Sequence, residues 1–161
     1  MLNELRQEAV TTKRLLDRVP GDRLGWRPHS KSMSLGQLAL HIANIPSGLS
    51  RLAQLDEFDV SNANFEPAMP ESKEMVMSAL ETSVAEASEY MASLSPEAAQ
   101  AGWRLTLRGA EVLSMPRAGM LRSLLLNHWY HHRGQLSVYL RLLEVPVPVI
   151  YGRSADENPF A

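Results

Sequence analysis

Residues 116–144 read PRAGMLRSLLLNHWYHHRGQLSVYLRLLE. Pro116 suits the first position of a helix, because that position needs no backbone N–H. Apolar residues then recur at spacings of three and four, which is typical of one face of an α-helix. This face comprises Leu121, Leu124, Leu125, Leu136, Tyr139, Leu140 and Leu143. The stretch therefore predicts a long amphipathic helix, which Pro146 and Pro148 end.

The same helical periodicity occurs in three earlier stretches, residues 1–19, 34–52 and 72–94. In the second, Ser34 and Gln37 have the spacing of a capping box, in which each side chain bonds a free backbone N–H at the helix start. Pro46 lies inside this second stretch and is expected to kink the helix or tighten one turn.

Two other segments connect these helices. Residues 56–71 lack periodicity and predict a long crossover connection between helices two and three, while residues 103–115 alternate in the manner of a short β-hairpin before helix four. We therefore expect an all-α fold, a four-helix bundle with one crossover connection, in a single domain over residues 1–161.

Composition limits the function classes. The 161 residues include 45% hydrophobic and 21% charged residues, which is ordinary globular usage and excludes disorder. The net charge of −2 argues against a nucleic-acid partner. The absence of cysteine excludes disulfides, thiolate metal ligands and a cysteine nucleophile. No leader segment or apolar run of about 18 residues is visible, so we expect no membrane association and a cytoplasmic location.

The histidines carry the chemical signal. His128 and His132 lie four residues apart, on adjacent turns of helix four, and within its apolar stripe. Two buried imidazoles need partners for their nitrogens, and a divalent metal ion takes one nitrogen from each ring. His41, at the edge of the stripe of helix two, is the best third ligand. The spacing alone leaves open the alternative that these are core histidines satisfied by protein groups.

Neighbouring residues receive weaker predictions. Gln135 lies near the stripe and is expected to bond within the site, whereas Arg133 is expected to point away and anchor the tail through Asp156 or Glu157. Leu126 falls about 140° from the stripe, where a monomer exposes it, so a homodimer is expected to cover it. His131 is interpreted as a boundary residue, and His29 receives no role.

Four segments together resemble the DinB-like superfamily. They read DRLGWRP at 22–28, SMSLGQLALHI at 32–42, HWYHHRGQL at 128–136 and YGRSADENPF at 151–160. The resemblance extends over nearly the whole chain. It implies a four-helix bundle that holds a divalent metal through His41, His128 and His132, and it implies a homodimer.

The resemblance leaves the reaction open. Superfamily members include thiol-dependent enzymes, such as bacillithiol S-transferases and a mycothiol-dependent maleylpyruvate isomerase. We therefore expect a small-molecule substrate, a Zn²⁺, Ni²⁺ or Fe²⁺ ion, and a low-molecular-weight thiol as cosubstrate. The alternatives are a metal-dependent hydrolase that activates water, and a non-catalytic metal-binding stress protein. No catalytic residue is assigned.

Overall fold

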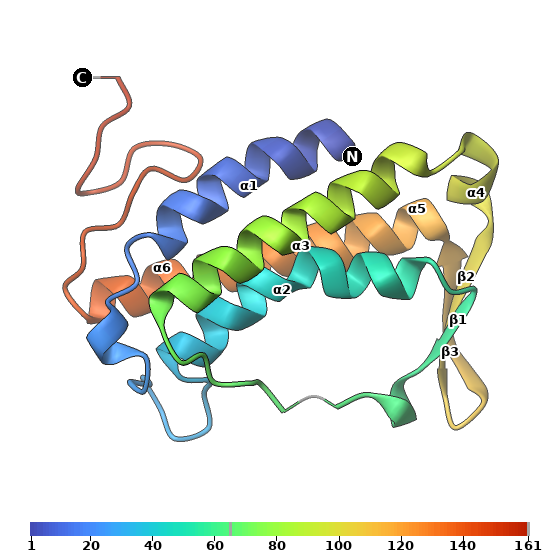
Figure 1. Ribbon diagram of the computed structural model, residues 1–161, viewed down its shortest axis with the longest axis horizontal. Helices are drawn as coiled ribbons and strands as arrows, with labels where there is room; N and C mark the ends of the chain where they lie inside the picture. The colour runs from blue at the N-terminus through green and yellow to red at the C-terminus, as the bar shows by residue number, and fades with distance from the viewer. Residues whose placement is uncertain (65, 161) are drawn as a thin grey trace.

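The computed structural model describes residues 1–64 and 66–160 and is mostly helical, with a small sheet at one end (Figure 1). The long helices are α1 (Leu2–Leu16), α2 (Leu35–Ala53) and α3 (Lys73–Ser93). A fourth helical stretch consists of α5 (Arg117–Met120), the π-helical segment η3 (Leu121–Asn127) and α6 (His128–Leu142). The mostly helical class is confirmed. Across the described ranges, no helix is both long and apolar enough to cross a membrane.

Contacts between the helices define the core. Helix α2 packs against α3 and α6, and α1 packs against the same two helices. The fully buried side chains between them are mainly leucines, with Trp103 and Trp129 as the largest. This burial of apolar surface is the main source of stability for the chain.

Helix α2 begins where its sequence predicts and runs through Pro46. Ser34 and Gln37 form the capping box. Pro46 has no N–H to offer the carbonyl four residues earlier, so the Ile42 carbonyl is free to accept a hydrogen bond from Trp129 Nε1 of α6 at 2.9 Å. The Ser47 N–H donates to Ser83 Oγ of α3 at 2.8 Å. Pro46 therefore frees the Ile42 carbonyl for α6, while the neighbouring Ser47 N–H ties α2 to α3.

The far end of α2 is held by long side chains from other elements. The Leu52 carbonyl accepts from Trp103 Nε1, and the Ala53 carbonyl accepts from the Tyr90 hydroxyl and from Arg117 Nη1. Arg117 is buried and also pairs with Asp56, at 2.7 Å. These contacts satisfy carbonyls that every helix C-terminus leaves without intrahelical partners.

The sheet has the order β1–β2–β3, with β1 (Glu57–Asp59) parallel to β2 (Gly102–Leu107) and β2 antiparallel to β3 (Ala110–Pro116). The predicted hairpin is confirmed as β2–β3. Its two turn residues, Arg108 and Gly109, both have positive φ, which the tight hairpin turn requires. Strand β1 and the short helix α4 (Pro96–Gln100) were not expected, and β1 extends the predicted hairpin to a three-stranded sheet.

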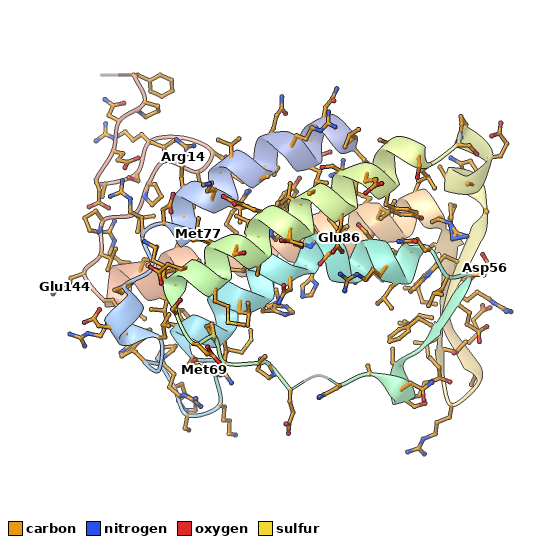
Figure 2. The ribbon with its side chains drawn as sticks, viewed as in Figure 1. Arg14, Asp56, Met69, Met77, Glu86 and Glu144 are labelled. Atoms are coloured by element: carbon orange, nitrogen blue, oxygen red, sulfur yellow. The ribbon has the colours of Figure 1, made fainter. Side chains whose placement is uncertain are left out.

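The connection between α2 and α3 is anchored at both ends. Figure 2 labels Asp56 near one end and Met69 near the other, and the described residues between them lie at the edge of the molecule. At the first end, β1 pairs with β2. At the second, Gln37 Nε2 donates to the Pro67 carbonyl at 3.0 Å, and Ser34 Oγ contacts Met69 Sδ. The start of α2 thus holds the end of the connection.

The prediction for Leu126 was wrong, because this side chain is 0% exposed. The wheel used for the prediction assumed 100° per residue, but Leu121–Asn127 forms a π-helix, whose wider turn takes up an extra residue. The phase of the fourth helical stretch therefore shifts before α6 begins. Leu126 packs inside the chain and gives no reason to expect a partner subunit.

The prediction for Arg133 was also wrong in its partners. Arg133 is 1% exposed and pairs with Glu8 of α1 at 2.5 Å, with the Tyr151 hydroxyl as a further acceptor. The tail carboxylates instead pair with other arginines, Asp156 with Arg141 and Glu157 with Arg18. Arg133 anchors the tail through Tyr151, from inside the protein.

Candidate metal centre

The three predicted ligands come together from two helices. His41 lies in the middle of α2, His128 is the first residue of α6, and His132 follows one turn later. His132 Nε2 lies 2.7 Å from His128 Nε2, and His41 Nε2 lies 3.4 Å from the same atom. All three rings offer a nitrogen within 4.8 Å of the others, and all three side chains are half-buried. The three histidines form the only group of metal-ligand type found in the described ranges.

Packing next to the rings sets their relative position. The hydrogen bond from Trp129 Nε1 to the Ile42 carbonyl joins the residues that directly follow His128 and His41. Trp129 and Ile42 are both fully buried. The bond therefore fixes α6 against α2 at the level of the histidines, and Pro46 makes it possible by leaving the carbonyl free.

A hydrogen bond also fixes the orientation of one ring. His132 Nδ1 lies 2.7 Å from Gln135 Oε1, and because an amide oxygen only accepts, the imidazole donates here. The lone pair of neutral His132 is then on Nε2, the atom that faces the other histidines. Metal-bound imidazoles usually have such a partner on the second nitrogen, so the contact expected for Gln135 is present.

The protonation states suit metal binding. Burial lowers the pKa of His41 and of His128, and the neighbouring histidines lower both further. Burial also lowers the pKa of His132 to about 4, despite the opposing effect of the Gln135 hydrogen bond. All three rings are therefore neutral at pH 7, which is the form of histidine that binds metals.

The donor set fits a divalent first-row metal ion. An ion about 2.1 Å from each nitrogen holds the nitrogens about 3.0–3.4 Å apart, for octahedral and tetrahedral arrangements respectively. The separation of 3.4 Å lies at the upper end of this range, and the separation of 2.7 Å between His128 and His132 is shorter than the range. Imidazole nitrogen suits Zn²⁺, Ni²⁺ and Fe²⁺ alike. Three protein ligands also leave coordination positions open, as in catalytic rather than structural sites.

A two-part groove adjoins the histidines, between α2 and the connection that follows β1. One part, which we call the apolar lobe, has a volume of about 450 Å³. It is lined by His41, Asn44, Ile45, Gly48, Leu49, Leu52, Phe58, Ala63, Asn64 and His128. The other part, the polar lobe, has a volume of about 360 Å³. It is lined by Met33, Gln37, Leu40, His41, Asn44, Asn64, Glu66, Pro67 and Ala68.

Several of these lining residues were not predicted. Asn44 lies one turn after His41 on α2 and lines both lobes, so its spacing from His41 was a usable signal. Phe58 and Asn64 come from the aperiodic connection, where no sequence pattern indicates which side chains turn inward. His131 is exposed, with its ring centroid 4.9 Å from that of His132, and His29 lies in an exposed loop.

A comparison with family models decides the relationship of this chain. The model of the DinB family matches residues 1–158. The chain belongs to the DinB family. No match is found among curated proteins.

Solved structures agree with this DinB assignment at the level of the fold. A DinB-like protein from Bacillus subtilis superposes with a TM-score of 0.71 at 17% identity, over 94% of this chain and 98% of the other. One from Bacillus cereus gives 0.69 at 21% identity, over 93% and 95%. A protein assigned to the same family from Exiguobacterium sibiricum gives 0.66 at 24%, over 92% and 93%.

Proposed function

We propose that this DinB protein binds one divalent metal ion through His41, His128 and His132 and is a metal-dependent enzyme. The observation that carries the proposal is the position of the three rings, whose Nε2 atoms converge while His41 and His128 also line a cavity. A site closed by a fourth protein ligand suits a purely structural or storage role, whereas open positions beside a cavity suit catalysis.

Such a metal supplies a nucleophile near neutral pH by lowering the pKa of a coordinated thiol or water. The chain holds the three imidazoles neutral through burial. Gln135 fixes the His132 ring so that Nε2 faces the site. Asn44 and Asn64 place amide groups at the junction of the two lobes, where they can orient a substrate.

The reaction that we favour is transfer of a low-molecular-weight thiol to a small-molecule substrate. Its support is the resemblance to thiol-dependent superfamily members, together with a chain that has no cysteine of its own. Hydrolysis by activated water uses the same histidines and is the alternative. We also propose a cytoplasmic location, where such thiols are available.

The first experiment measures binding of Zn²⁺, Ni²⁺ and Fe²⁺ to tag-free protein by calorimetry. We expect one ion per chain in the wild type and a loss of binding in His41→Ala and His132→Ala, with His29→Ala as the matched control. Wild-type binding that survives in both site variants contradicts the metal site. A screen of thiol consumption and ester cleavage by the metal-loaded protein then separates transferase from hydrolase, and inactivity in both contradicts the enzymatic role.

A further inference from the structure

The apolar lobe lies directly beside the histidines rather than in a separate part of the molecule. His41 and His128 form part of its wall, and the rest comes from α2 and from the connection after β1. Its volume of about 450 Å³ falls within the usual range for small-molecule sites, about 300–1,000 Å³. A molecule held here therefore touches the candidate metal centre.

One face of α2 forms the floor of this lobe. Ile45, Gly48 and Leu52 follow His41 at spacings of four, seven and eleven, so all four residues lie along one side of the helix. Phe58 of β1 and Ala63 face them from the connection. Among the described residues, the lining contains no Asp, Glu, Lys or Arg.

The polar lobe differs on the other side of His41. Gln37, Asn44, Asn64 and Glu66 give it amide groups and a carboxylate. His41 and the two asparagines line both lobes and so stand at the junction. The groove is therefore amphipathic, with its polar and apolar halves meeting at the proposed metal centre.

We propose that the apolar lobe binds an uncharged, apolar group of the substrate, with the polar end of the reactants held in the other lobe. A charged group in the apolar lobe loses hydration and finds no charged partner, whereas an apolar group gains from leaving water. The substrate class is then a compound with an alkyl or aryl group. Phosphorylated compounds and dicarboxylates fit this lobe poorly. That the bound compound is a substrate rests on the proposed function. Binding of an apolar group in the lobe can be tested without metal and without an activity assay.

Gly48 is the position chosen to fill the lobe, and it also borders a second cavity between α2 and α3. A Cβ built on this glycine meets no atom within 4 Å, and the residue lies inside α2 with ordinary helical φ. Gly48→Leu therefore adds an apolar side chain whose Cβ meets no atom, and it does not oppose the helix. Gly134→Leu on α6 is the matched control, because Gly134 is also a helical glycine with open space and lines neither lobe.

The probe is the neutral dye N-phenyl-1-naphthylamine, titrated by fluorescence into metal-free protein. We expect saturable binding to the wild type and to Gly134→Leu, at least tenfold weaker binding to Gly48→Leu, and weaker binding of the sulfonated analogue 8-anilino-1-naphthalenesulfonate. The absence of dye binding, equal affinity in Gly48→Leu, or tighter binding of the sulfonate overturns the inference.

Zinc titration of the same three proteins separates this inference from the proposed function. Dye binding without zinc binding contradicts the metal site and leaves the lobe assignment standing. Zinc binding without dye binding contradicts the lobe assignment and leaves the metal site standing. Circular dichroism melting of each variant is the folding control, and it tests whether a lost binding signal comes from unfolding.

Discussion

Gln135 is the side chain that orients His132, through the 2.7 Å contact between its Oε1 and His132 Nδ1. Gln135→Ala leaves the ring free to rotate and its Nδ1–H without a fixed partner. Partners of this kind usually contribute at least tenfold to metal affinity. We therefore expect zinc affinity to fall by about tenfold in a calorimetric titration. Gln7→Ala, an exposed change on α1, is the control, and equal affinities in the two variants would contradict the role of Gln135.

The lowered pKa values of the histidines make the stability of the metal-free protein depend on pH. The pKa of His132 is about 4 in the folded chain and 6.5 without these surroundings. Between these values the unfolded chain takes up the proton first, so acid favours unfolding. We expect the free energy of unfolding in urea with EDTA to fall from pH 7 to pH 5. The fall should be smaller in His132→Gln, and parallel pH profiles would disprove the assignment.

The sequence predicted which residues gather at the candidate site better than it predicted the directions of individual side chains. His128 and His132 were identified because their spacing placed both imidazoles on one apolar helix face, and His41 because it lay at the edge of the apolar face of another helix. The structure brings their nitrogens together. The partners of Arg133 could not be predicted, because Glu8 lies 125 residues away in the sequence and the phase of α6 was wrong.

At the scale of the elements, one hydrogen bond connects α2 to α6 beside the site. Trp129→Phe removes the donor to the Ile42 carbonyl and leaves that buried acceptor unpaired, which costs about 1–3 kcal/mol. We expect this loss in urea unfolding, together with weaker zinc binding. Trp103→Phe removes an equivalent bond to the Leu52 carbonyl, about 15 Å further along α2. The control should lose stability but keep its zinc affinity; an equal loss of affinity would refute the local role of Trp129.

Helix ends were easier to predict than helix phase. The capping box at Ser34 is a local pattern, and it occurs where the sequence indicates. The π-helix over Leu121–Asn127 has no comparable signal, because its extra residue is set by which side chains the rest of the core can accept. A regular α-helix of 100° per residue therefore gave the wrong exposure for Leu126.

At the scale of the whole molecule, long-range pairing limited what the sequence could predict. Strand β1 is three residues long and exists because β2, about 45 residues later, pairs with it. Neither segment indicates the other. The connection that carries β1 also forms one wall of the groove, so the shape of the candidate substrate site was beyond local reasoning, although the helices around it were not.

The homodimer remains a prediction, now without Leu126 as its basis. Val138 and Leu142 lie one turn apart on α6 and are 56% and 58% exposed, which leaves an apolar strip for a partner chain. We expect light scattering to give about twice the chain mass, and Val138→Glu to give a folded monomer. Val10→Glu, at an exposed position on α1, is the control. A monomeric wild type, or dissociation by Val10→Glu alone, would exclude this interface.

The bond from Trp129 to the Ile42 carbonyl also has a kinetic consequence. Because protein groups alone make this bond, α2 and α6 hold the three histidines close together without an ion, so the proposed metal requires no large rearrangement of the helices. Association that needs a conformational change is slow and levels off as ligand concentration rises, whereas association with a preformed site does not. The observed rate of metal uptake should therefore increase in proportion to metal concentration. The maximum rate of metal uptake is then set by the exchange of water molecules on the incoming ion, which is a property of the metal and not of the protein.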